Sequence, residues 1–266
     1  MMMRTQRTTR ARRSPVRTYE VYRPWLYIGL LGVAEVVSDI WHPLLGIWLH
    51  VLLAGALWWQ GTQEADLDRR RLYWILSILA IVRIISFAVS DTSFPGIWYY
   101  VVAETPLLVA AITALRAFGL TWSEVGVRLP KWWMLSIVVI ITGAALGLAE
   151  SRIIHPPALI SSLTWGHIIF PSLLLIIFTG LSEELLFRGL LQHYAVKVMG
   201  NGSGIVFVAL SWSLLHIGWH SAWDVVFVFG VGLAWGWIRQ KVNSIIPTTI
   251  AHGLANIVLF LIVPLQ

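Results

Sequence analysis

The feature that most constrains how this chain can fold is a series of nine long apolar segments between Pro24 and Val263. A helix that spans a bilayer needs about 20 predominantly apolar residues, and the segments approach that length. The first two are separated only by the dipeptide His42–Pro43, so they could form a tight hairpin or a re-entrant pair. We expect an all-α, polytopic transmembrane helical bundle with about eight spans. The segments are Pro24–Trp41, Pro43–Trp59, Leu72–Val89, Ile97–Leu115, Trp132–Leu148, Trp165–Leu181, Gly204–Ile217, Trp223–Ile238 and Ile245–Val263.

The composition is that of a membrane protein. The chain of 266 residues is 58% hydrophobic and 12% charged, whereas a soluble domain is roughly 45–50% apolar and about 25% charged. No polar linker is long enough to separate two domains, so one continuous bundle is expected. The chain has no cysteine, which excludes disulfides, thiolate metal sites and cysteine nucleophiles.

Arginines are concentrated at the N-terminus. Residues 1–23 have few apolar side chains, and we interpret them as a disordered, basic cytoplasmic tail. Such a run can bind nucleic acid or can act as a topology signal with affinity for anionic lipid. We favour the second interpretation and expect no nucleic-acid partner. The seven arginines of this tail are Arg4, Arg7, Arg10, Arg12, Arg13, Arg17 and Arg23.

The distribution of charge also predicts the orientation of the bundle. If the N-terminus is cytoplasmic and all nine segments cross, the cytoplasmic connections are residues 60–71, 116–131, 182–203 and 239–244. Together with the tail they hold 17 of the 19 lysines and arginines, in agreement with the positive-inside rule. We expect an integral protein of the cell (inner) membrane. This topology places Ser182–Leu191, of sequence SEELLFRGLL, at the cytoplasmic end of a membrane helix.

Several ionisable residues lie where they are costly. A charged side chain near the bilayer centre costs at least about 2.5–3.5 kcal/mol on insertion scales, and such residues usually face the bundle interior and have a function. They can also serve helix packing alone. The candidates are Glu35, Asp39, Arg83, Glu104, Glu183, Glu184, Arg188, Asp224, His216, His220 and His252.

Helical spacing groups some of these candidates. Glu184 and Arg188 are four residues apart, so they share a helix face and can pair. Glu183 is about 100° around the helix from Glu184 and points elsewhere. His252 and Asn256 also share a face, and the small residues around them (Ala251, Gly253 and Ala255) allow another helix or a substrate backbone to approach closely. His216 and His220 form a third such pair.

These residue types suit hydrolysis. A glutamate and a histidine that converge on one water can activate it as a nucleophile, and hydrogen-bond donors can hold the oxyanion of a tetrahedral intermediate. Glu183, His216 and His252 could instead ligate zinc. We expect no serine nucleophile, because no serine lies in a Gly-x-Ser-x-Gly setting.

The HIGWH sequence, His216 to His220, has the spacing of the zinc motif His-Glu-x-x-His. Position 217 is isoleucine, so the general-base glutamate of that motif is missing. We expect His220 to lie near the outer end of its span, at the membrane interface.

Three motifs resemble those of the CPBP family, the CAAX proteases and bacteriocin-processing enzymes, also called the ABI family. EELLFRG, Glu183 to Gly189, resembles the family's Glu-Glu-x-x-x-Arg motif. WSLLH resembles its Phe-x-x-x-His motif, with Trp212 in place of phenylalanine, and HGLAN resembles its His-x-x-x-Asn motif. The resemblance runs from about Ile168 to the C-terminus. It divides the chain into the tail (1–23), N-terminal transmembrane helices (24–164) and a CPBP-like catalytic helical core (165–266).

The resemblance implies an intramembrane endopeptidase whose active site lies within the bundle and opens to the cytoplasmic side. Glu183 would be the general base, His216 would assist it, and His252 with Asn256 would form the oxyanion hole. Glu184 and Arg188 would support the site. No cofactor is required in this interpretation; zinc, held by Glu183, His216 and His252, is the alternative. The change to Trp212 should leave the chemistry intact and could narrow the cavity.

The implied substrate is a membrane protein or a lipidated peptide, which could be prenylated or anchored by its C-terminus. Two other functions stay open at this point. The chain could be a non-catalytic partner or immunity protein that retains the fold. It could also be a transporter that uses Glu35, Asp39, Arg83 and Glu104 as a relay, although pairing of Arg83 with an acid would give these residues a structural role.

Overall fold

The computed structural model describes residues 18–89 and 93–266, and in these ranges the protein consists of helices and connections with no strand. The expected all-α bundle is confirmed. Its helices are α1 (Thr18–Val36), α2 (Pro43–Gln63), α3 (Leu67–Ala88), α4 (Ile97–Ala117), α5 (Trp133–Ile154), α6 (Trp165–Leu175), α7 (Ser182–Glu184), α8 (Gln192–Met199), α9 (Asn201–Leu214), α10 (Ala222–Val242) and α11 (Ile246–Ile257). Shorter π-helical and 3-10 segments join or extend them: Val37–Trp41, Ile176–Leu181, Leu185–Leu191, Ile217–Trp219, Val258–Ile262 and Val263–Leu265.

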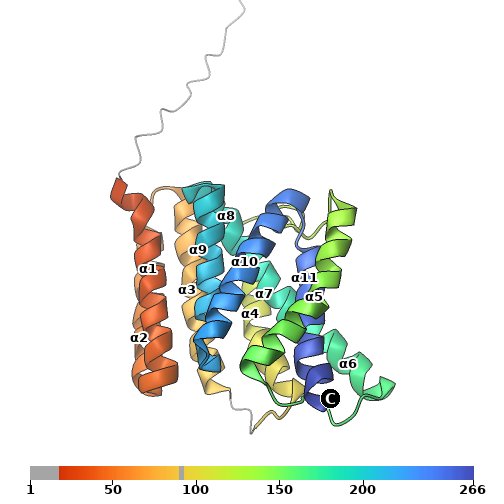
Figure 1. Ribbon diagram of the computed structural model, residues 1–266. Helices are drawn as coiled ribbons and strands as arrows, with labels where there is room; N and C mark the ends of the chain where they lie inside the picture. Colours follow the sequence, from red (N-terminus) through yellow and green to blue (C-terminus); the bar gives the residue numbers. More distant parts are fainter. Residues whose placement is uncertain (1–17, 90–92) are drawn as a thin grey trace, which may run out of the picture.

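In the described residues, eight continuous helices are long and apolar enough to cross a membrane, which agrees with the expected number of about eight. The hairpin partner of α2, helix α1, adds a ninth helix of similar length. Successive long helices run in opposite directions, so that α1 begins at one end of the bundle and the C-terminus lies at the other (Figure 1). The protein is therefore an integral membrane protein.

The first two helices form a tight hairpin. His42 is extended between them, and Pro43 occupies the first turn of α2, where its missing N–H is not needed. The Nδ1 atom of His42 accepts a hydrogen bond from the Leu45 N–H at 3.3 Å and so caps α2. The two helices thus form the tight turn that was one of the arrangements expected for this segment. Helix α1 begins at Thr18, so the expectation of a tail to residue 23 was wrong for residues 18–23; the rest of that tail lies outside the described residues.

The motif Ser182–Leu191 does not end a membrane helix, contrary to the prediction. The helix continues without a break from Trp165 to Met199 and ends before Gly200, whose φ of 82° favours glycine. The charges of Glu184 and Arg188 do not stop the helix because they neutralise each other inside the bundle, 2.9 Å apart. Two π-helical segments flank α7 in this long helix. Such segments are rare and often occur at functional sites.

Close packing of α5 against α11 organises the centre of the bundle. A Cβ at Gly143 or Gly147 would collide with the backbone of Ala251 or Ala255, so glycine is required on α5 at both positions. On the other side of α11, a Cβ at Gly180 would come within 2.8 Å of the Thr249 carbonyl oxygen. The prediction that small residues near His252 admit a neighbouring helix is thus confirmed.

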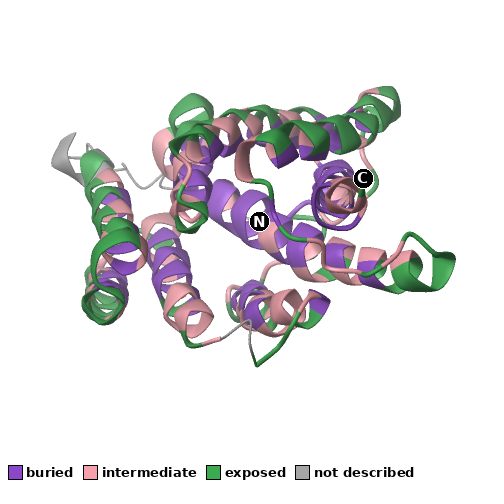
Figure 2. Cartoon of the chain, turned by 60° about the horizontal axis from the view of Figure 1, so that its bottom comes forward, coloured by how far each residue is buried: buried purple, intermediate pink, exposed green. Residues whose placement is uncertain are grey.

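Burial decreases from the centre of the bundle to its edge. Figure 2 shows buried residues on the inner helices, while the residues of the α1–α2 hairpin are mostly exposed. Its exposed side chains include large apolar ones such as Leu26, Trp48 and Leu52. In a membrane these side chains face lipid, so their exposure has no hydrophobic cost.

Candidate active site

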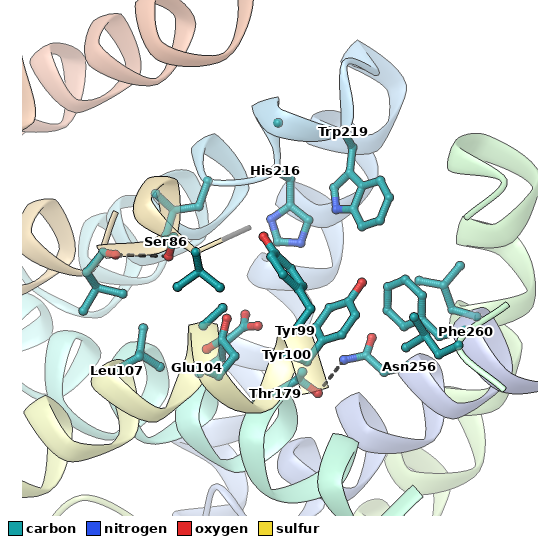
Figure 3. Close-up of a pocket in the computed structure, with 18 of the residues that line it drawn as sticks. Ser86, Tyr99, Tyr100, Glu104, Leu107, Thr179, His216, Trp219, Asn256 and Phe260 are labelled. Carbon is teal, nitrogen blue, oxygen red and sulfur yellow. Dashed lines mark hydrogen bonds between the residues drawn. The ribbon is translucent and has the colours of Figure 1, made fainter. Parts of the chain in front are cut away.

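The four residues expected to carry catalysis line one cavity. Glu183, His216, His252 and Asn256 come from α7, from the turn after α9, and from α11, and all face a cavity of about 860 Å³. Figure 3 shows His216 and Asn256 on two sides of this cavity, with Tyr100 between them. Helical spacing alone could not establish this convergence, because the three elements are far apart in sequence.

Glu183 faces the cavity and Glu184 does not. The Oε2 atom of Glu183 accepts a hydrogen bond from Trp212 Nε1 at 2.6 Å. Glu184 is fully buried on the other face of the helix, where it pairs with Arg188. The expected division of the two glutamates is therefore present: one side chain is buried in the bundle and the other reaches the cavity.

Glu184 and Arg188 form a buried brace that also reaches His252. Both side chains are 0% exposed, and Glu184 Oε1 lies 2.9 Å from Arg188 Nη1 and 3.6 Å from His252 Nδ1. The Arg188 guanidinium stacks over the ring of Trp212 at 4.0 Å and over that of Trp235 at 5.6 Å. An arginine is suited to such stacking because its charge is planar and delocalised. The brace thus links the Glu183 helix to both histidine motifs.

The His216 ring is oriented by the last turn of α9. Its Nδ1 atom lies 3.2 Å from the Trp212 carbonyl oxygen. Because a carbonyl oxygen only accepts hydrogen bonds, Nδ1 carries the proton of the neutral ring. The Nε2 atom is then an acceptor, able to take a proton from water or to ligate a metal.

The side-chain amide of Asn256 is oriented by Thr179. The Thr179 hydroxyl donates to the Leu175 carbonyl oxygen and accepts a hydrogen bond from Asn256 Nδ2 at 2.7 Å (Figure 3). Since a hydroxyl has one proton, this arrangement determines which end of the Asn256 amide faces Thr179. The second Nδ2 hydrogen is free for another acceptor, and Asn256 lines the cavity.

Other carboxylates share the cavity. Glu104 accepts a hydrogen bond from the Ser182 hydroxyl at 3.3 Å. Glu150 lines the same cavity and also lines a smaller pocket with His216 and His252. In the part of the chain that the structure describes, the ligand atoms of Glu150, His216 and Asp224 all lie within 4.8 Å of one another. This is a spacing at which carboxylate and imidazole ligands could hold a metal ion. It differs from the expected set of Glu183, His216 and His252.

Three of the four residues considered for a transport relay form an ion-pair cluster. The Arg83 guanidinium binds Glu35 through two hydrogen bonds of 2.7 Å and approaches Asp39 Oδ2 at 3.5 Å. His50 Nε2 lies 3.6 Å from Glu35 Oε1. Bidentate pairing of this kind explains the buried charge of Glu35 structurally.

The pairing of His216 with His220 was predicted wrongly. Helix α9 ends at Leu214, a 3-10 turn follows, and His220 has a φ of 53° and is exposed. The chain therefore turns between the two histidines, so that His216 lines the cavity and His220 is absent from its lining. The expected interfacial position of His220 agrees with its exposure.

Sequence reasoning missed Glu150 and Thr179. Glu150 lies near the end of α5, two residues beyond the predicted span 132–148, and Thr179 is an ordinary polar residue in an apolar stretch. No charged or polar residue lies three or four positions from Glu150 on either side, so helical spacing gives it no partner. Only the packing of α5 against α11 brings Glu150 to the cavity.

One comparison with known proteins gave a match. The family model described as type II CAAX prenyl endopeptidase Rce1-like matches residues 165–258. Comparisons with curated proteins and with solved structures gave no match. The matched range contains all four of the cavity residues Glu183, His216, His252 and Asn256.

Proposed function

Through residues 165–258 the chain belongs to the CAAX protease (CPBP) family, and from this premise we propose that it cleaves a peptide bond of a membrane-associated protein with a water activated by Glu183. A CAAX-type intramembrane protease is the general function that the family supports. The observation that carries the finer proposal is the convergence of Glu183, His216, His252 and Asn256 on one cavity inside a membrane bundle.

The proposed reaction begins with a water between Glu183 and the substrate carbonyl. Glu183 takes a proton from the water while the water oxygen attacks the carbonyl carbon. His216 Nε2 accepts a hydrogen bond from the same water and so orients it. The carbonyl oxygen becomes an oxyanion. When the intermediate collapses, the C–N bond breaks and the proton held by Glu183 passes to the leaving amine.

His252 and Asn256 are the proposed oxyanion donors. Asn256 would donate its second Nδ2 hydrogen to this oxygen. The Nδ1 atom of His252 faces the Glu184 carboxylate, so a protonated His252 would have its Nε2–H left to donate to the same oxygen. A donor that is already oriented stabilises the transition state without a reorganisation cost; loss of one such donor typically slows catalysis by about 100- to 1,000-fold.

The proposal requires no cofactor. The alternative is a zinc ion. In the part of the chain that the structure describes, the ligand atoms of Glu150, His216 and Asp224 lie within 4.8 Å of one another, whereas the expected set of Glu183, His216 and His252 lines the cavity without meeting this spacing. Zinc would supply a bound water of lowered pKa and a Lewis acid for the carbonyl. The proposed partners are the lipid bilayer and a membrane protein or lipidated peptide as substrate.

The test is cleavage of a lipid-anchored peptide library by the full protein in proteoliposomes. Glu183→Gln, His252→Ala and Asn256→Ala should each abolish or strongly reduce cleavage. The matched control is His220→Ala, which removes an exposed histidine four residues from His216 and should cleave like the wild type. Cleavage that survives both Glu183→Gln and His252→Ala would overturn the proposal. The alternative is a non-catalytic partner that retains the fold. It would be supported if neither the wild type nor any variant cleaves and the Glu183→Gln variant still complements a strain that lacks the protein.

A further inference from the structure

The cavity reaches the surface at one end of the bundle. Besides the catalytic candidates, its lining includes residues that end or begin long helices: Asp39 after α1, Val89 after α3, Gly96 before α4, Pro157 after α5, Trp219 after α9 and Phe260 near the end of α11. All of these helix ends lie at the end of the bundle that also carries the C-terminus (Figure 1).

The opposite end is closed above the site. The long helix continues past Glu183 through Phe187, Arg188, Leu190, Leu191 and Tyr194, each of which is at most 1% exposed. The described residues of the connections at that end, 64–66, 118–132 and 243–245, contribute nothing to the cavity lining. A substrate from that side would have to pass through the packed brace of Glu184 and Arg188.

The closed end carries most of the basic residues. Residues 18–266 contain 13 lysines and arginines, and ten of them lie at or near this end: Arg23, Arg69, Arg70, Arg71, Arg116, Arg128, Lys131, Lys197, Arg239 and Lys241. Arg188 is buried in the bundle, and Arg83 and Arg152 lie toward the open end. Six more arginines precede α1 in the sequence.

We propose that the basic end of the bundle is cytoplasmic and that the cavity opens on the opposite, extracytoplasmic side of the membrane. Basic residues are retained on the cytoplasmic side during insertion, and here ten of 13 in the described range lie at one end. The resemblance implied a site that opens to the cytoplasm, whereas the combination of cavity and charge points to the other side. The substrate is then a membrane-anchored or lipidated polypeptide whose scissile bond lies at the outer surface. This substrate class rests on the proposed protease function; the orientation of the cavity does not.

Because the chain contains no cysteine, single cysteines can report the side of each surface directly. Ser86→Cys places a thiol in the cavity lining, Ser161→Cys places one in the exposed connection at the open end, and Ser123→Cys places one in the exposed connection at the basic end. The full protein is expressed in a bacterial host, and spheroplasts are treated with a membrane-impermeant maleimide before or after permeabilisation. Ser86→Cys and Ser161→Cys should react in intact spheroplasts, whereas Ser123→Cys should react only after permeabilisation.

The reverse pattern would overturn the proposal. So would a Ser86→Cys thiol that reacts from neither side while the Ser161→Cys thiol reacts, because the cavity would then be closed. Labelling needs no catalysis, so the double variant Ser86→Cys/Glu183→Gln should label like Ser86→Cys alone. If Glu183→Gln abolishes cleavage but labelling is reversed, the orientation alone is wrong. If labelling is as expected but Glu183→Gln still cleaves, the proposed function alone is wrong.

Discussion

The indole of Trp212 donates a hydrogen bond of 2.6 Å to the carboxylate of Glu183. The family motif has phenylalanine at this position, and phenylalanine has no hydrogen to donate. The exchange of phenylalanine for Trp212 therefore adds more than volume to the cavity wall. It also gives Glu183, the residue that we propose to activate water, a hydrogen-bond donor for its carboxylate. The same ring lies under the Arg188 guanidinium at 4.0 Å.

Trp212→Phe should slow cleavage without abolishing it. The variant keeps an aromatic ring under Arg188 but releases Glu183 from its donor, and a hydrogen bond to a charged group contributes about 1.5–3 kcal/mol, so a rate loss of roughly 10- to 100-fold is expected. The loss should be in kcat rather than KM. The control is Trp235→Phe, since Trp235 stacks on Trp212 at 5.8 Å but makes no hydrogen bond with Glu183. Equal kinetics in both variants would contradict a role for the indole N–H.

Arg188→Met should strongly destabilise the protein because it leaves the Glu184 carboxylate buried without its partner. Breaking a buried pair in this way typically costs about 3–5 kcal/mol. The double variant Glu184→Gln/Arg188→Met removes both charges and should recover part of the thermal stability measured in detergent. If the single and double variants unfold at the same temperature, the buried pair is not the source of the effect.

Thr179→Val should reduce cleavage because it removes the acceptor that orients the Asn256 amide. Thr179→Ser keeps the hydroxyl and should retain most of the rate, while the unfolding temperature of both variants distinguishes catalysis from stability. A net hydrogen bond is worth about 0.5–1.5 kcal/mol, so we expect a several-fold loss in kcat for the valine variant. Equal rates for valine and serine would argue that Asn256 is oriented by other contacts.

Gly147→Val should disturb the packing of α5 against α11. A side chain at Gly147 meets the Ala255 backbone, next to Asn256, so both stability and cleavage should fall. Overpacking of this kind costs about 1–3 kcal/mol. Gly29→Val is the control, because a Cβ at Gly29 on α1 meets no atom within 4 Å. The unfolding temperature of the two purified variants measures the difference, and similar losses in both would contradict the packing argument.

Metal content separates the two hydrolytic mechanisms. In the cofactor-free proposal, elemental analysis of the purified protein should give well under one metal per chain, and a chelator should leave the cleavage rate unchanged. One equivalent of zinc that is lost in Asp224→Ala but kept in Asp39→Ala would instead assign the metal to Glu150, His216 and Asp224. Both variants remove an aspartate near the cavity, and only Asp224 belongs to that group.

Features that depend on local spacing could be predicted from the amino-acid order. Apolar segments of about 20 residues specified the membrane helices, and the four-residue spacing of Glu184 and Arg188 specified their pairing, because residues four apart share a helix face. The same geometry turned Glu183 away from that pair. Local spacing failed at His216–His220, where the chain leaves the helix after Leu214.

Features that depend on contacts between helices required the folded chain. The hydrogen bond from Trp212 to Glu183, the one from Asn256 to Thr179, and the arrival of Glu150 at the cavity join residues that are 29 or more positions apart. Helix periodicity carries no information over such separations; they depend on how the helices pack, as the glycine contacts of α5 with α11 illustrate. The direction in which the cavity opens has the same origin, since it depends on which helix ends leave space between them and which are filled by buried side chains.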